Sequence, residues 1–166
     1  MSAVRGPDGS LTWDIEKLSE ALKLPRGDIL EYFSDGRRAS FIVERRIERE
    51  VLRGRRPVSE GAPYDVEDPH GRKWEVRSIT AGGVYFCPSK DVGSGRAFHE
   101  DAFLSKANAI EGYVLADITT FPTVPYWFVA SKKVLEWYGA GKLGAGTKTS
   151  RDRMLALLSV LPPYMP

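Results

Sequence analysis

A β-hairpin is encoded in residues 64–77, which read Tyr64-Asp65-Val66-Glu67-Asp68-Pro69-His70-Gly71-Arg72-Lys73-Trp74-Glu75-Val76-Arg77. The Pro69-His70-Gly71 segment supplies the turn, because proline and glycine favour the backbone angles that reverse a chain. Apolar and polar residues alternate on both sides of the turn, which is the period of a strand with one buried face. The pattern predicts strands over 64–67 and 73–80, with Asp65 and Glu75 on neighbouring strands.

This hairpin brings two carboxylates and a cation together. Successive side chains of a strand point to opposite faces, so Glu75 and Arg77 share one face while Val76 points to the other, where we expect a helix to cover it. Carboxylate and backbone oxygens are the ligands that a hard cation such as Mg²⁺ prefers, and Mn²⁺ takes the same ligands. Asp65, Glu75 and the carbonyl of Val76 are therefore candidate metal ligands. A metal held there would lower the pKa of an attacking water and neutralise charge on a phosphodiester.

Hydrophobic periodicity predicts the other helices and strands. We expect helices over 12–24, 28–33, 39–52, 99–110, 131–138 and 150–160, and further strands over 84–87, 113–118 and 126–130. In the third helix Val43, Ile47 and Val51 recur every four residues and form a buried stripe. The first three strands would form an antiparallel meander. The order predicts an α/β (α+β) fold with a mixed sheet, in which a helical segment, 1–36, precedes a core over 37–166.

The composition narrows the class of protein. With 166 residues, of which 42% are hydrophobic, the chain has the length of one domain that buries its own core. Cys87 is the only cysteine, which excludes an internal disulfide, and the first residues lack the apolar core of a signal peptide. We therefore expect a cytoplasmic protein. No apolar run is long enough to span a bilayer, so we expect no membrane partner.

Basic residues gather in two places. The stretch 36–56 holds eight arginines against three glutamates, and arginine suits bidentate contacts with phosphates, although a solvated helix face has the same composition. Arg37 and Arg38 open this stretch and are candidate DNA contacts. A polar loop after the predicted strand 84–87 supplies a second set of candidates, of the kinds that contact phosphates and base edges. They are Ser89, Lys90, Arg96 and His99.

The spacing of Asp65, Glu75 and Arg77 resembles the active-site pattern of the PD-(D/E)xK nuclease superfamily, and specifically that of its short type II restriction endonucleases. The likeness covers about residues 60–140, and two further runs carry it. They are Glu75-Val76-Arg77-Ser78-Ile79 and Val124-Pro125-Tyr126-Trp127-Phe128-Val129-Ala130. The resemblance implies a restriction-endonuclease-like core of order αβββαβ, a Mg²⁺ cofactor, and Asp65 and Glu75 as the carboxylates that bind it.

Arg77 stands where the family has a catalytic lysine. Arginine stays protonated in proteins and has a planar fork, so Arg77 can hold a phosphate or orient a water but cannot act as a general base. Three explanations are open: a working enzyme whose metal alone activates the water, which we favour; a lysine that has moved to Lys73 or Lys90; or a catalytically inactive copy. The family also places a glutamate of the opening core helix near the metal. Glu44 and Glu48 are the candidates, with Glu44 preferred.

The resemblance implies a Mg²⁺-dependent type II restriction endonuclease that cuts double-stranded DNA at a short palindromic site. One active site per subunit and two strands to cut make a two-fold homodimer the natural arrangement, and a cognate DNA methyltransferase is expected in the same system. The helices of 1–36 would either dimerise, as the resemblance implies, or read DNA as a helix-turn-helix. The alternatives are a non-catalytic DNA-binding protein with a degenerate nuclease core, and a DNA repair or junction nuclease of the same fold.

Overall fold

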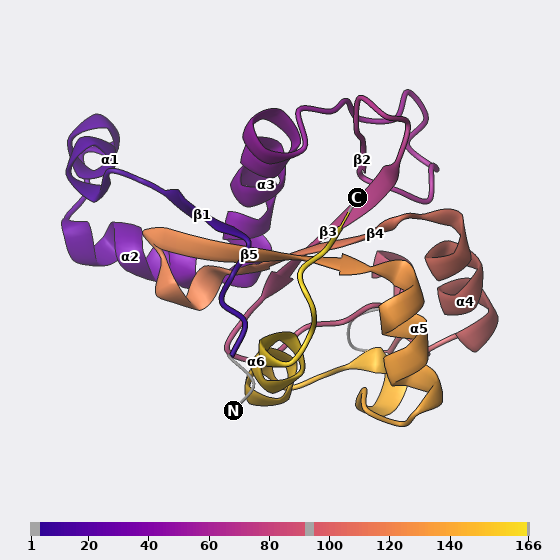
Figure 1. Cartoon of the computed structure of the whole chain (residues 1–166). Coiled ribbons are helices and arrows are strands. Elements are labelled where there is room, and N and C mark those ends of the chain that lie inside the picture. Colours follow the sequence, from indigo (N-terminus) through magenta and orange to yellow (C-terminus); the bar gives the residue numbers. More distant parts are fainter. Residues whose placement is uncertain (1–3, 92–94, 166) are drawn as a thin grey trace.

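A five-stranded mixed sheet forms the centre of the protein, and helices cover both of its faces (Figure 1). The computed structural model describes residues 4–91 and 95–165, without the side chains of residues 36, 37 and 89. Within these residues the strand order is β1-β5-β4-β3-β2, with β3 and β4 parallel and the other neighbours antiparallel. The strands are β1 (Gly9–Thr12), β2 (Val66–Glu67), β3 (Lys73–Ile79), β4 (Gly112–Asp117) and β5 (Thr123–Ala130). The predicted α/β fold with a mixed sheet is confirmed.

The helices divide between the two faces of the sheet. On one face lie α1 (Ile15–Leu22), α2 (Arg26–Ser34) and α3 (Gly36–Arg46), and the last continues as a π-helical turn, Ile47–Val51. On the other face lie α4 (Glu100–Ala109), α5 (Ser131–Gly139) and α6 (Arg151–Ser159). Because β3 and β4 are parallel, the chain must cross over between them, and α4 makes that crossover.

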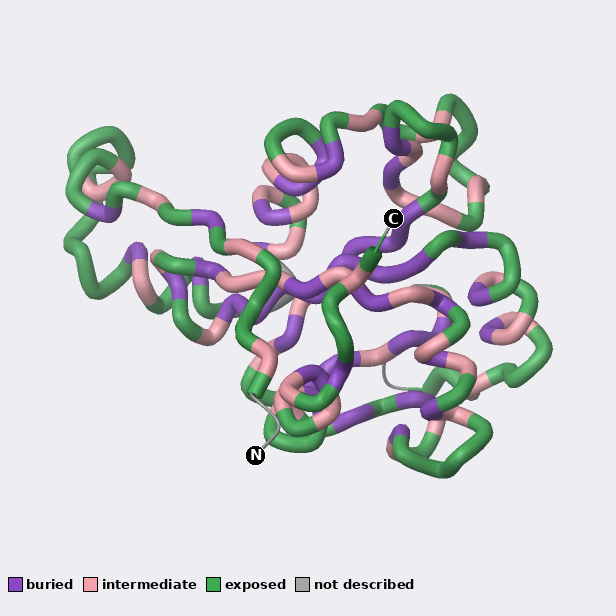
Figure 2. Tube along the Cα trace, viewed as in Figure 1, coloured by how far each residue is buried: buried purple, intermediate pink, exposed green. Residues whose placement is uncertain are grey.

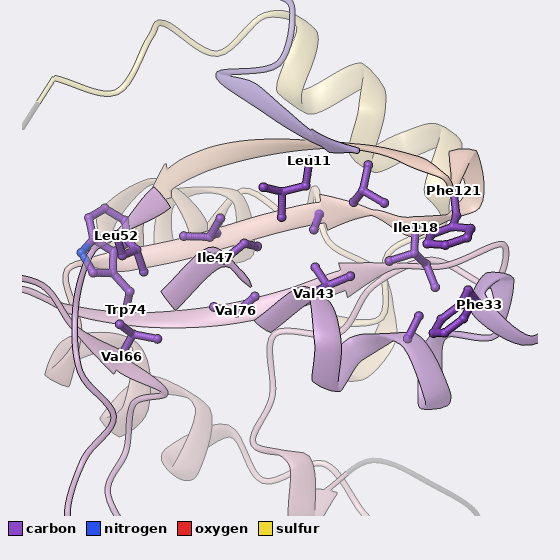
Figure 3. Packing of buried hydrophobic residues seen from close by; sticks show 14 of the residues in the cluster. Leu11, Phe33, Val43, Ile47, Leu52, Val66, Trp74, Val76, Ile118 and Phe121 are labelled. Carbon is purple, nitrogen blue, oxygen red and sulfur yellow. The ribbon is translucent and has the colours of Figure 1, made fainter. Parts of the chain in front are cut away.

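Alternation along β3 sends its side chains into two separate cores. Trp74 and Val76 belong to the same core as Val43 and Ile47 of the α3 segment, which are fully buried, whereas Val51, the third member of the predicted stripe, is only partly buried (Figure 3). Figure 2 shows that buried residues gather along the central strands. Ile79 belongs instead to the core beneath α4, α5 and α6. Glu75, Arg77 and Ile79 are alternate residues of β3, so their side chains point to the same face and Glu75 and Arg77 face α4. Val76 points to the other face, where a helix covers it, as the sequence predicts.

The predicted third strand, 84–87, is wrong as a member of the sheet, and so is the meander. Val84 makes only an isolated bridge with Thr149, and β3 pairs with β4 instead. The hydroxyl of Thr147 accepts hydrogen bonds from the backbone N–H groups of Phe86 and Cys87, at 3.2 and 2.9 Å. The segment thus satisfies its backbone without a neighbouring strand. The observed core lacks the third strand of the implied αβββαβ order.

The amino-terminal part contributes a strand that the sequence does not predict. Residues 9–12 form β1, which pairs with residues 123–126 of β5. Helix α1 begins only after Asp14, whose side chain caps the helix by accepting a hydrogen bond from the N–H of Lys17. Ile29 and Phe33 of α2 are buried in the same core as the α3 stripe. The described part of the segment 1–36, from residue 4 onward, is thereby joined to the sheet and its core. No helix in the described part of the chain is long and apolar enough to cross a membrane.

Candidate active site

Asp65 lies beside β3, immediately before the first residue of the short strand β2. Its N–H donates to the carbonyl of Trp74, and its Oδ2 accepts the N–H of Val76, both at 2.9 Å. The side chain thus replaces the backbone partner that a longer β2 would give to Val76. Because the N–H and C=O of one strand residue point to the same side, the carbonyl of Val76 also faces Asp65. The hairpin therefore brings Asp65 beside the backbone of Val76, as its spacing predicts.

Glu75 is a buried carboxylate in which one oxygen is paired with cations and the other has no partner among the described residues. Its Oε1 lies 2.6 Å from Nζ of Lys106 and 2.8 Å from the guanidinium of Arg77. Its Oε2 is buried and has no hydrogen-bond partner among the described residues. Tyr113 is the register partner of Glu75 on β4, and its hydroxyl is likewise buried without a partner in the described part. A further polar group, such as a water or an ion, would satisfy these two buried atoms.

Arg77 is anchored rather than directed toward solvent. Its Nη2 donates to the carbonyl of Cys87 at 2.9 Å and pairs with Glu75, and only 14% of its side chain is exposed. The guanidinium therefore connects β3 to the segment that was predicted as a third strand. Held in this way, Arg77 keeps the Glu75 side chain in position, a role that fits its permanent charge.

Lys106 is the functional candidate that the sequence analysis missed. It reaches Glu75 from α4, thirty-one residues along the chain, and 15% of its side chain is exposed. The two lysines considered as replacements lie elsewhere: Lys73 is exposed with Nζ over the ring of Tyr64, and Lys90 is exposed. One signal was present in the sequence. Lys106 follows Phe103 by three residues, within the apolar stripe of α4, where a lysine must either reach solvent or find a carboxylate.

The two glutamates of the α3 segment take different positions. Glu48 is buried and lies 3.4 Å from both Arg45 and Arg56, so its charge is compensated. Burial raises the pKa of Glu44; Arg45 opposes this effect, and the carboxylates of Glu75 and Glu48 add to it. The charge of Glu75 therefore acts on Glu44, and the preference for Glu44 over Glu48 stays a prediction.

The surroundings of Asp65 raise the pKa of its carboxyl group strongly. Burial, followed by the carboxylates of Glu75 and Glu44, raises the pKa of Asp65 to about 7, against the lowering effects of the Val76 N–H and of Arg77. Binding of a proton or of a cation reduces the repulsion between these three carboxylates. A groove of about 680 Å³ opens onto Glu44 and Asp65 between the α3 segment and residues 56–65, so solvent and ions reach them.

The donor set fits a hard divalent cation. Asp65, the free Oε2 of Glu75 and the carbonyl of Val76 are all oxygen ligands, and Mg²⁺ commonly takes only one or two carboxylates and keeps several waters. In residues 4–91 and 95–165 no group of three or more His, Cys, Asp or Glu side chains is gathered closely enough to hold a metal. A cation here would therefore rest on two carboxylates, a backbone oxygen and water.

The other candidate DNA contacts are not gathered at this site. Lys90 and Arg96 are exposed, Arg38 lies 3.6 Å from Asp35, and the side chains of Arg37 and Ser89 lie outside the described residues. His99 precedes α4, and its Nδ1 lies 3.2 Å from Asp91. None of these contacts includes Asp65 or Glu75.

Comparison with known proteins gave no match to a family model, a curated protein or a solved structure.

Removing the charge of Asp65 is expected to stabilise the metal-free protein at high pH. With a folded pKa of about 7 against an ordinary 3.8, ionising Asp65 opposes folding, and this cost grows from about pH 4 to pH 7 and is then constant. Asp65→Asn keeps an acceptor for Val76 but removes the cost. Denaturant unfolding in EDTA should show the variant gaining roughly 2 to 4 kcal/mol relative to the wild type between pH 4 and pH 8.

The exposed Asp101 of α4 supplies the matched control. Asp101→Asn should show no comparable gain in stability over the wild type between pH 4 and pH 8. A stability difference for Asp65→Asn that does not change with pH would show that Asp65 is not crowded by carboxylates.

Proposed function

We propose that this protein is a Mg²⁺-dependent endodeoxyribonuclease of the type II restriction class. The observation that carries the proposal is the hairpin site, in which Asp65 is bound to the backbone of Val76 and Glu75 is buried with one free oxygen. The same residues are those that resemble the PD-(D/E)xK pattern. The raised pKa of Asp65 adds support, because a cation would relieve the repulsion that causes it.

Each residue of the site has a role in this reaction. Asp65, Glu75 and the Val76 carbonyl would hold Mg²⁺, and Glu44 would bind one of its waters. When bound, the ion lowers the pKa of a water and stabilises charge on the phosphate. Arg77 pairs with Glu75 and positions it, from the place that the PD-(D/E)xK pattern gives to lysine. Lys106 supplies an ammonium donor on the same carboxylate and can orient the attacking water beside it.

Lys106 resolves the apparent absence of a lysine. A lysine ammonium is compact and exchanges its proton far more readily than a guanidinium, so it can serve where arginine cannot. With Lys106 on α4 and Arg77 on β3, two cations share one carboxylate oxygen. We therefore favour a working enzyme over an inactive copy, with its lysine at position 106 and not at 73 or 90.

The substrate and assembly follow from the same proposal. Double-stranded DNA has two strands to cut, and a two-fold homodimer would present one such site to each strand. The arginines of 36–56 would contribute phosphate contacts, and a DNA methyltransferase of the same specificity would protect the host sequence. In this arrangement the helices α1 and α2 are available for dimerisation or DNA contact.

Digestion of a sequenced plasmid tests the proposal. Purified protein with Mg²⁺ should give discrete fragments whose ends share one short sequence. DNA binding without cleavage in either Mg²⁺ or Mn²⁺ would identify the non-catalytic DNA-binding protein. Cutting that depends on nicks, flaps or junctions, rather than on sequence, would identify a repair nuclease and reject the restriction assignment.

A further inference from the structure

A pocket of about 430 Å³ lies at the other end of the hairpin from the carboxylates. Trp74, Phe128 and Tyr164 line it and pack mostly edge-to-face, with ring centroids 5.4 Å apart for Trp74 and Phe128 and 5.2 Å apart for Trp74 and Tyr164. The hydroxyl of Tyr164 donates to Glu111 at 2.7 Å, which fixes the third ring. Figure 3 shows Leu52, another lining residue, beside Trp74 at this end of the core. Trp74 is only 1% exposed, so it supports this aromatic wall from behind, and the half-buried rings of Phe128 and Tyr164 form its surface.

Cationic side chains line the same pocket, and its carboxylates are already compensated. Asp68 is 6% exposed and accepts four hydrogen bonds, from the backbone of His70 and Arg72, from Nε of Arg72 and from the indole of Trp74. Asp8 is bound by Arg5 and by the N–H of Phe128. The side chains of Arg53 and His70 make no hydrogen bond or ion pair with any residue in the described part. Arg53 thus brings to the pocket a positive charge that no carboxylate of the described residues compensates, and His70 adds a ring that can donate a hydrogen bond.

Arg53 also holds a backbone conformation that disfavours it. Its φ is +50°, in the left-handed region that glycine adopts at no steric cost. The next residue is Gly54. In the turn after the π-helical segment it is nevertheless Arg53, and not this glycine, that has the positive φ. Lys23 ends α1 with a similar φ of +54°, so this conformation is not by itself a sign of function, and what distinguishes Arg53 is that its side chain also lines the pocket.

We propose that this pocket binds a nucleotide, with the base against the aromatic wall and the phosphate on Arg53, Arg72 and His70. Aromatic faces stack with any base, and arginine forks match phosphate oxygens. The volume is within the range of small-molecule sites. Neither Asp65 nor Glu75 takes part, so the inference does not rest on the proposed nuclease activity.

Two sources could present this chemistry, a free nucleoside monophosphate and a nucleotide within a DNA strand. A second hollow, of about 530 Å³, shares Arg53 and Asp68 with the pocket and continues past Arg55 and Gly71, which leaves room for a strand. Asp68 follows Asp65 by three residues, about 10 Å at the rise of an extended strand, so a bound strand would run near the carboxylates.

Calorimetric titration in EDTA tests the proposal without any cleavage step. The probes are 5′-dAMP and a single-stranded oligonucleotide of twelve deoxyadenosines, titrated into the wild type and into Arg53→Gly. The glycine accepts φ +50°, so the variant should unfold at the same or a higher temperature while its affinity falls at least about tenfold, the size of a lost charged phosphate contact. Lys23→Gly is the matched control, because Lys23 is a cation with φ +54° outside the pocket.

The outcomes separate clearly. Binding of 5′-dAMP that Arg53→Gly weakens and Lys23→Gly preserves supports a site for the free nucleotide. Binding of the oligonucleotide alone, with the same dependence on Arg53, supports a site for a nucleotide of a strand. Absence of binding by both probes, or equal affinities for the wild type and Arg53→Gly, would overturn the proposal, whether or not the protein cuts DNA.

Discussion

Changing Glu75 to glutamine is expected to lower the rate of Mg²⁺-dependent plasmid cleavage by on the order of 1000-fold. Glutamine keeps the shape of the side chain and one oxygen for the 2.6 Å contact with Lys106, but it removes the charge that would hold a cation. A Mg²⁺ ion contributes several kcal/mol to a phosphoryl transition state, and a loss of about 4 kcal/mol gives this factor. The measurement is the initial rate of conversion of supercoiled plasmid at saturating protein.

Stability must be followed in the same variant, because Glu75 is a buried ion-pair partner. Neutralising it leaves Lys106 and Arg77 buried without their counter-ion, which costs roughly 3 to 5 kcal/mol where no compensation occurs. Rates should therefore be compared at a temperature where both proteins are folded. The exposed Glu136 of α5 provides a control, and Glu136→Gln should cut at the wild-type rate. A folded Glu75→Gln that also cuts at that rate would remove Glu75 from the site.

Changing Lys106 to methionine is expected to reduce cleavage by about 100-fold while leaving the affinity for DNA near that of the wild type. Methionine fills a similar volume in the apolar stripe of α4 but has no ammonium to donate to Glu75 or to a water. A positioned acid or base contributes a factor of about 100 to 10,000, and the retained Arg77 places the expectation at the lower end.

A second substitution can show whether the lysine must be at position 106 or can also act from position 77. Arg77→Lys added to Lys106→Met would return a lysine to the position where the family carries it. Recovery of at least a tenth of the wild-type rate is expected, provided the lost contact of Arg77 with Cys87 does not unfold the segment 84–87. Full activity of Lys106→Met alone would show that the metal activates the water without a lysine. No recovery in a folded double variant would show that the Arg77 fork is required.

The sequence predicted the hairpin, and the closeness of Asp65 to the strand of Glu75, because the relevant information is local. Ten residues separate Asp65 from Glu75, and a turn between two strands of period two fixes which side chains share a face. The bond from Val76 to Asp65 follows from that geometry. The stripe of Val43 and Ile47 was also predictable, because a helical period of four identifies a buried face without knowledge of its partner.

The features that the sequence did not predict depend on contacts between distant segments. Lys106 reaches Glu75 only because β3 and β4 pair in parallel and α4 crosses between them. The segment 84–87 has the composition of a strand, but the hydroxyl of Thr147, sixty residues away, takes the hydrogen bonds that a neighbour would have made. Strand β1 has only four residues, and its pairing with β5 gives no periodic signal in the sequence.

Cleavage of supercoiled plasmid by the wild type and by Asp65→Ala, each in Mg²⁺ and in EDTA, tests whether the carboxylate site hydrolyses DNA. We predict cutting by the wild type in Mg²⁺ alone, and none above background by Asp65→Ala even where gel-shift assays show that it binds the same DNA. Cutting by Asp65→Ala at the wild-type rate, or wild-type cutting that is unchanged in EDTA, would contradict the assignment of Asp65 and Glu75 as a metal-dependent nuclease site.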